Sequence, residues 1–155
     1  MLEIERKFLV TSAAFKEVAQ KATRITQGYL STDPERTVRV RIKGEKGFLT
    51  IKGKSNDSGT TRIEVEEEIT VDKAEILLKL CLSGVIDKTR YEYAVNEHIW
   101  EIDAFYGDNE GLIIAEIELT TEGESFEKPS WIGEEVTGDT KYYNSQLSNN
   151  PFKNW

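Results

Sequence analysis

Acidic residues recur two positions apart at three places in this sequence. Glu3 and Glu5 form one pair and Glu116 and Glu118 another, while residues 64–68 hold three glutamates at alternating positions. In an extended strand such residues share one face about 7 Å apart, because each residue advances the chain by about 3.3 Å. Like charges at that distance repel unless something binds between them. Paired carboxylates supply the hard oxygen ligands that Mg²⁺ and Mn²⁺ prefer, so these pairs predict a divalent-metal site.

Basic residues are grouped in the same way. Arg39, Arg41 and Lys43 alternate along one stretch, and Lys88 and Arg90 along another. Arginine and lysine bind phosphate oxygens, arginine often through two hydrogen bonds. A metal site combined with such cations is typical of phosphoryl transfer, where positioning and charge neutralisation supply most of the catalysis. The sequence holds neither a P-loop nor a dinucleotide-binding glycine motif, so the phosphate site must be built differently.

The elements that would position these residues are strands. Eight stretches alternate with period two, and in all but one of them charged residues share one face. Short turns rich in glycine and asparagine separate many of the stretches, which favours antiparallel pairing. A single charged strand would ordinarily be a solvated surface. Eight strands with blocks of one sign favour an interior site, since solvated faces usually mix signs to pair across strands. The stretches are Leu2–Val10, Thr26–Ser31, Thr37–Lys43, Phe48–Lys54, Arg62–Thr70, Asp87–Val95, Ile99–Phe105 and Leu112–Leu119.

A sheet of eight strands with one charged face can stay open or close into a barrel. Closure removes the exposed edges and turns the charged face into a lumen. We therefore expect a single α+β domain over residues 1–155, mainly antiparallel β, with an eight-stranded closed barrel and helices packed outside. Helices are predicted over Ser12–Ala22, over Asp72–Leu82, where Asp72 and Glu75 form a capping-box pattern, and over Asp139–Leu147.

Composition limits the partners. The 155 residues carry a net charge of −8 at pH 7, so we expect no nucleic-acid partner. No apolar stretch approaches the length of a membrane span, and the charged start is unlike a signal peptide. With a single cysteine, a cytoplasmic location is expected. Trp131 and Trp155 either pack the outer helices or contribute to an interface, which leaves a homodimer open.

The opening Glu3-Ile4-Glu5-Arg6-Lys7 resembles the signature of the CYTH superfamily, also called the triphosphate tunnel metalloenzymes, which carries Glu-x-Glu-x-Lys on its first strand. Such a short motif is weak alone, but the resemblance covers nearly the whole chain. It continues through Gln27–Leu30, Arg39–Arg41, Thr50–Gly53, Arg62 with Glu64 and Glu66, Lys88–Tyr91, Glu101–Asp103, Ala115–Glu118, Glu135–Thr137 and Tyr142–Asn144.

The resemblance implies a triphosphate bound inside an eight-stranded tunnel. It implies that Glu3, Glu5 and Glu118 hold one divalent ion, Mg²⁺ or Mn²⁺, with Glu116 nearby. A second ion would be supported by one or more of Glu64, Glu66 and Asp103. The residues that would bind the phosphates are Lys7, Arg39, Arg41, Lys52, Arg62, Lys88 and Arg90.

Tyr29 matches the position assigned as proton acceptor in short bacterial members, where it would act with Lys52. Without the resemblance Tyr29 would be interpreted as an ordinary barrel-packing residue. The expected activity is metal-dependent hydrolysis of inorganic tripolyphosphate. Three alternatives stay open: a class IV adenylyl cyclase, a nucleoside or thiamine triphosphatase, and a polyphosphate-binding module without catalysis. The carboxylates argue against the last, because acids in an anion site are costly unless they hold a metal.

Overall fold

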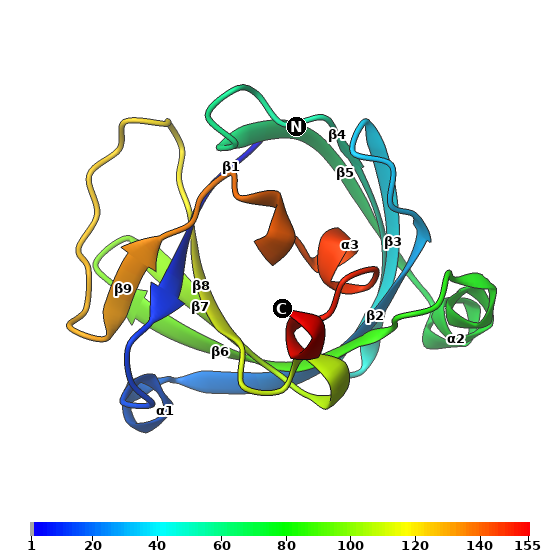
Figure 1. Cartoon of the computed structure of the whole chain (residues 1–155), viewed down its shortest axis with the longest axis horizontal. Helices are drawn as coiled ribbons and strands as arrows, with labels where there is room; N and C mark the ends of the chain where they lie inside the picture. The colour runs from blue at the N-terminus through cyan, green and yellow to red at the C-terminus, as the bar shows by residue number, and fades with distance from the viewer. Residues whose placement is uncertain (1) are drawn as a thin grey trace.

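Nine β-strands form one antiparallel sheet in the computed structural model, which describes residues 2–155. Their order is β5-β4-β3-β2-β6-β7-β8-β1-β9, and a further pairing of β5 with β1 closes β1 to β8 into a barrel (Figure 1). This confirms the predicted barrel. The strands are β1 (Leu2–Val10), β2 (Lys21–Ser31), β3 (Arg36–Lys43), β4 (Lys46–Gly53), β5 (Thr61–Ile69), β6 (Ile86–Val95), β7 (His98–Phe105), β8 (Ile113–Glu118) and β9 (Ile132–Glu135).

The hydrophobic core has two parts. One lies at the end of the barrel, where the C-terminal residues Val136, Tyr142 and Leu147 pack with Ile86, Phe105, Leu112 and Ile114. The other lies outside the barrel wall. On β1, β7 and β8 the side chains that alternate with the charged ones pack outward, under helix α1 (Phe15–Val18) and the chain between β8 and β9. Phe8 and Trp100 meet edge to face at 5.5 Å, and both are fully buried. The apolar half of the alternation on these three strands is thus largely buried outside, whereas Ile51, Ile63 and Val65 on β4 and β5 point outward and stay exposed. The charged half is left for the lumen. The residues of this cluster are Phe8, Phe15, Trp100, Ile102, Ala115, Ile117, Leu119 and Trp131.

The prediction of a helix over Ser12–Ala22 is wrong for most of its length. Only Phe15–Val18 is helical, and β2 already begins at Lys21. Lys21 pairs with Glu92 and Ala22 with Tyr91 on β6, so sheet pairing prevails over the helical spacing of the apolar residues. Strand β2 therefore starts five residues before the predicted Thr26. Strand β9 is a further difference, since the sequence pattern does not predict it.

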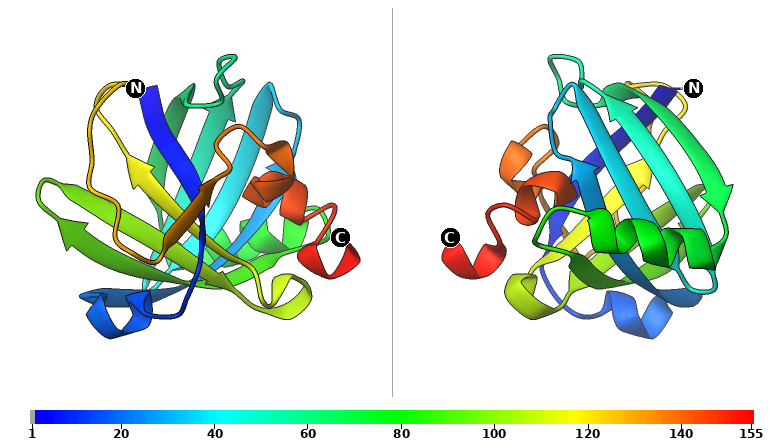
Figure 2. Two further views of the ribbon diagram at one scale, coloured as in Figure 1. Left: turned by 60° about the vertical axis from the view of Figure 1, so that its left-hand side comes forward. Right: turned by 90° about the vertical axis from the view of Figure 1, so that its right-hand side faces the viewer.

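Helix α2 (Val71–Leu80) packs on the outside of the barrel against β3 and β4, as predicted (Figure 2). Its cap is not the expected Asp72 and Glu75 pair. The side chain of Thr70 accepts a hydrogen bond from the Lys73 backbone N–H at 3.2 Å, which caps the first turn. A Cβ at Gly47 would lie 2.9 Å from the Cβ of Ala74, so the glycine permits this close approach.

The C-terminal segment lies over one opening of the barrel instead of against its outer wall (Figures 1 and 2). It contains the short helices η2 (Thr140–Tyr142), α3 (Asn144–Leu147) and η3 (Phe152–Asn154). One more short helix, η1 (Gly107–Asn109), lies in the connection between β7 and β8. The predicted helix Asp139–Leu147 is broken at Tyr143, which is extended with φ −69° and ψ 134°. This segment therefore closes one end of the lumen.

None of the helices in residues 2–155 combines the length and the hydropathy that crossing a membrane would require.

Candidate active site

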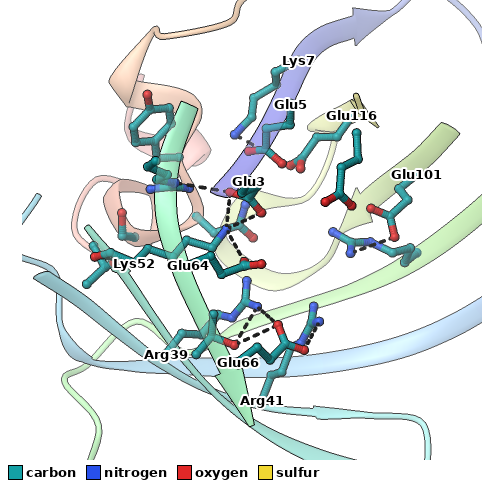
Figure 3. A pocket seen from close by; sticks show the side chains of 18 of the residues that line it. Glu3, Glu5, Lys7, Arg39, Arg41, Lys52, Glu64, Glu66, Glu101 and Glu116 are labelled. Atoms are coloured by element: carbon teal, nitrogen blue, oxygen red, sulfur yellow. Dashed lines mark hydrogen bonds and ion pairs between the residues drawn. The ribbon is translucent and has the colours of Figure 1, made fainter. Parts of the chain in front are cut away.

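The barrel encloses a cavity of about 260 Å³ whose lining is mostly charged (Figure 3). The strands bring together all the predicted site residues except Asp103. Eight basic and seven acidic side chains line the cavity, so cations and carboxylates almost balance. The lining consists of Glu3, Glu5, Lys7, Tyr29, Thr37, Arg39, Arg41, Lys43, Thr50, Lys52, Arg62, Glu64, Glu66, Lys88, Arg90, Glu101, Glu116, Glu118, Tyr143, Asn144 and Ser145.

Two opposite walls of the lumen, β3 and β8, carry opposite charge, while cations and carboxylates are mixed on the strands between them. Around the closed ring β3 lies four strands from β8, and β2 lies four strands from β1, so each of these pairs faces across the lumen. The arginines of β3 therefore face the glutamates of β8. Tyr29 on β2 faces the carboxylates of β1 in the same way. A ligand in the cavity would contact cations on one side and carboxylates on the other.

Arg39 and Arg41 form the basic wall. Both approach Glu66, with guanidinium-to-carboxylate distances of 3.7 and 3.4 Å. The Nε atoms of both arginines are nevertheless buried without a hydrogen-bond partner in residues 2–155. Burial, together with the neighbouring Arg39 and Arg90, lowers the pKa of Arg41 to about 10. Both guanidinium groups line the cavity, where a bound phosphate could accept hydrogen bonds from them in place of their contacts with Glu66.

The carboxylates on β1 and β8 crowd one another. Burial and the nearby charges of Glu116 and Glu3 raise the pKa of Glu5 to about 8. Burial opposes the ionised form of Glu116 too, but Lys7 and Arg90 and a hydrogen bond from Glu5 hold its pKa well below the ordinary value. Two acids that share a proton in this way are typical of a site where a cation would otherwise separate them.

The same carboxylates are the candidate ligands of a divalent metal. In residues 2–155, no three acidic, histidine or cysteine side chains already form a metal-binding group. One reason is that both oxygens of Glu3 accept hydrogen bonds from Lys52 at 3.0 Å. The donor set nevertheless fits a hard cation, since Glu3, Glu5 and Glu116 supply only oxygen and repel one another as they stand. Glu118 completes the set, with its pKa raised by partial burial and by Glu3.

Asp103 points into the barrel but is buried beneath Arg90 and Lys88, and so does not line the cavity. Its oxygens accept two hydrogen bonds from Arg90, both at 2.8 Å, and Lys88 approaches at 2.8 Å. Burial opposes its ionisation, but Arg90 and Lys88 lower the pKa of Asp103 to about 2. The ammonium group of Lys88 also donates to the Asn144 side chain at 2.9 Å. Asp103 therefore orients two of the cations that are predicted to bind phosphate.

We expect Asp103→Asn to destabilise the fold by about 3–5 kcal/mol, because it leaves Arg90 and Lys88 buried together without their counter-charge. Urea denaturation followed by circular dichroism measures the change. Asp87→Asn is the matched control, since it breaks an ion pair with Arg24 that is largely exposed and should change the midpoint little. Equal midpoints for the two variants would contradict the structural role of Asp103.

Sequence reasoning missed several residues of the lining. Glu101 shares the charged face of its strand with Asp103 and belongs to the resemblance, but the sequence assigned it no role in the site. Tyr143, Asn144 and Ser145 could not, because they follow no periodic pattern and reach the lumen only through the fold of the C-terminal segment. Asn144 accepts a hydrogen bond from Gln27 at 2.9 Å across a sequence separation of 117 residues. Only the resemblance of Tyr142–Asn144 to a family segment pointed to this region.

Three comparisons with known proteins agree with this geometry. The CYTH domain family model matches residues 1–149. A protein named inorganic triphosphatase from Acetivibrio thermocellus is 51% identical over 154 residues, which cover 99% of this chain and 97% of the relative. A protein of the same name from Nitrosomonas europaea is 36% identical over 152 residues, covering 96% and 97%. The crystal structure of the inorganic triphosphatase NE1496 has a TM-score of 0.65 at 33% identity, covering 94% of this chain and 93% of that chain.

Proposed function

Since this chain belongs to the CYTH domain family, we propose that it is a triphosphatase that hydrolyses inorganic triphosphate in its tunnel with the help of a divalent metal. The alignment with two inorganic triphosphatases over nearly the full length of this chain supports the reaction. The observation that carries the proposal is the pair of cavity-lining guanidinium groups of Arg39 and Arg41, opposite a set of mutually repelling carboxylates.

The basic side chains bind and orient the substrate. Arg39 and Arg41 project from one wall, Lys88 and Arg90 from β6 beside them, and Lys7 from β1. Each cation is held by a carboxylate in the structure, for example Lys7 by Glu116 at 3.7 Å. A triphosphate would replace some of these contacts with charge-assisted hydrogen bonds of its own. Lys52 and Arg62, both beside Glu3, complete the proposed phosphate-binding set.

We assign Glu3, Glu5, Glu116 and Glu118 as the residues that would hold the metal. When bound there, Mg²⁺ or Mn²⁺ would neutralise charge that develops on the transferred phosphoryl group. The three residues proposed for a second metal ion, Glu64, Glu66 and Asp103, do not occupy equivalent positions. Glu64 and Glu66 line the tunnel on β5 beside Lys52 and Arg41, whereas both oxygens of Asp103 are engaged by cations. Of these three, Glu64 and Glu66 are the better candidates.

Tyr29 and Lys52 are the proposed catalytic residues. Tyr29 is 6% exposed and lies on β2, across the lumen from the carboxylates of β1. Its hydroxyl is the candidate acceptor for a proton from the attacking water. Lys52 contacts Glu3 at 3.0 Å and Glu64 at 3.4 Å, so its ammonium group sits among the carboxylates and can stabilise negative charge next to the reacting phosphate.

The proposal predicts that phosphate release requires a divalent metal and is faster from tripolyphosphate than from ATP, because the lining offers charge for phosphates and little for a nucleobase. The test is a phosphate-release screen over tripolyphosphate, ATP, thiamine triphosphate and pyrophosphate, each with and without chelator. Cyclic AMP formed from ATP would identify a class IV adenylyl cyclase instead. Tripolyphosphate that binds equally well in chelator, without turnover, would identify a binding module.

Three further expectations stay predictions: the choice between Mg²⁺ and Mn²⁺, the cytoplasmic location, and a homodimer. Metal titration of the phosphate-release rate decides the first. In the structure Trp131 is buried against Phe15 and Tyr93 and is therefore a packing residue, whereas Trp155 is 42% exposed.

A further inference from the structure

A second cavity of about 220 Å³ adjoins the lumen at the end covered by the C-terminal segment. Four residues border both cavities, namely Thr37, Arg62, Tyr143 and Ser145. The connection between β4 and β5 and the chain before α3 form the rest of its wall. The other residues that line it are Pro34, Lys54, Ser55, Asn56, Asp57, Gly59, Gly138, Thr140 and Gln146.

The two cavities differ in chemistry. Fifteen of the residues around the lumen are charged, whereas the second cavity has only Lys54, Asp57 and Arg62. Most of the surface of its walls is apolar, including the faces of Tyr143 and Pro34, with a few hydroxyl groups and amides between. Such a lining suits an uncharged polar group such as a sugar or a base, and does not suit a further phosphate. Each cavity alone is smaller than the roughly 300 Å³ at which pockets usually hold organic ligands, but joined they would exceed it.

The ring of Tyr143 stands between them. Lys7 Nζ lies 4.9 Å from its centroid and Arg62 Cζ lies 5.4 Å from it, so two tunnel cations hold the ring. Its hydroxyl is 3.4 Å from the Ser55 hydroxyl on the β4–β5 connection. Its backbone carbonyl accepts hydrogen bonds from Gln146 and Leu147, both at 2.9 Å. Contacts from three elements thus fix the ring in place.

We propose that Tyr143 is a specificity-determining residue, a partition that confines the substrate to an unsubstituted triphosphate by closing the tunnel against the second cavity. While the ring is there, a nucleoside attached to a terminal phosphate is kept out of the second cavity and has only the charged lining of the lumen beside it. The second cavity is where that nucleoside would fit once the ring is removed. This inference rests on the proposed function and extends it from the reaction to the choice of substrate.

The test compares ATP with tripolyphosphate in Tyr143→Ala and Tyr143→Phe. We expect Tyr143→Ala to raise the kcat/KM for ATP relative to that for tripolyphosphate by about tenfold or more. Tyr143→Phe is the matched control, since it keeps the ring and loses only the contact with Ser55, so its ratio should equal that of the unaltered protein. Tyr143→Leu serves if the alanine variant is unstable, with an expected ratio between the two.

Calorimetric binding of ATP and of tripolyphosphate to the same variants gives a readout that does not depend on turnover. Tyr143→Ala should strengthen the binding of ATP relative to tripolyphosphate. An unchanged ratio in both assays, or equal changes in the alanine and phenylalanine variants, would overturn the partition. Failure of the unaltered protein to hydrolyse tripolyphosphate would instead overturn the proposed function, and the binding ratio would still test Tyr143.

Discussion

Replacing Glu5 with glutamine is expected to lower kcat for tripolyphosphate by about a thousandfold. The amide has the size of the carboxylate but no negative charge, so a candidate metal ligand is lost while packing is kept. Stabilisation of the transferred phosphoryl charge is worth several kcal/mol, and each 1.4 kcal/mol or so corresponds to about tenfold in rate. The fold itself should not suffer, because burial and the charges of Glu116 and Glu3 already favour the uncharged form of Glu5.

Steady-state kinetics, metal titration calorimetry and thermal unfolding together separate the causes. Glu5→Gln should bind metal weakly and unfold at the same temperature as the unaltered protein or a higher one. Glu68→Gln is the control, since Glu68 lies on β5 outside the cavity lining and only approaches Lys46 at 3.8 Å. Glu5 has no role as a metal ligand if its glutamine variant keeps both the normal kcat and the normal affinity for metal.

The Tyr29→Phe variant is expected to lose about 10²–10⁴-fold in kcat with little change in KM. General-base help is typically worth that factor, and the change removes one hydroxyl from a site held by many charges. A loss confined to turnover is the pattern of an interaction made only in the transition state. Because Tyr29 is almost fully buried, the phenylalanine ring should fill the same space and leave the barrel intact.

Kinetics over a range of tripolyphosphate concentrations measures the two constants. Tyr93→Phe is the matched control, because Tyr93 packs outside the barrel against Trp131 and should leave kcat unchanged. A raised KM with normal kcat in Tyr29→Phe would make Tyr29 a binding residue. Lys52, which already contacts two carboxylates of the lumen, would then be the better candidate to assist the attacking water.

The charged face of each strand could be predicted from sequence because parity decides it. Once the sheet closes, a residue such as Arg39 or Glu116 must point inward if its apolar neighbours point outward. Fourteen of the fifteen predicted site residues reach the lumen for this reason. Asp103 lies on the inward-facing side of its strand, but strand alternation does not show whether an inward side chain reaches the cavity or is buried beneath others. Its position beneath Arg90 and Lys88 depends on pairing between β6 and β7 that no local pattern encodes.

The closed end of the tunnel was beyond prediction for a different reason. The C-terminal segment is irregular, so no period marks which of its side chains face the lumen. Tyr143 contacts Lys7, Arg62 and the Ser55 hydroxyl of the β4–β5 connection, all of which are far from it in sequence. Sequence periodicity predicts the strands of the barrel wall but does not predict which segment covers the opening at either end.

Strand β1 has a consequence for how the molecule assembles. It is the first strand to be synthesised, yet its partners are residues 61–63 of β5, residues 114–118 of β8 and residues 132–135 of β9. Strands that are neighbours in sequence, such as β3 and β4, can pair as local hairpins. Strand β1 can pair only after its distant partners have been synthesised, and such long-range pairing is slow because a long loop must close. Strand β1 carries the lumen residues Glu3, Glu5 and Lys7. A nascent chain therefore has no tunnel until β1 pairs with β5 and β8 and closes the barrel. Until then β1 is unpaired, and its alternating charges help to keep it from aggregating.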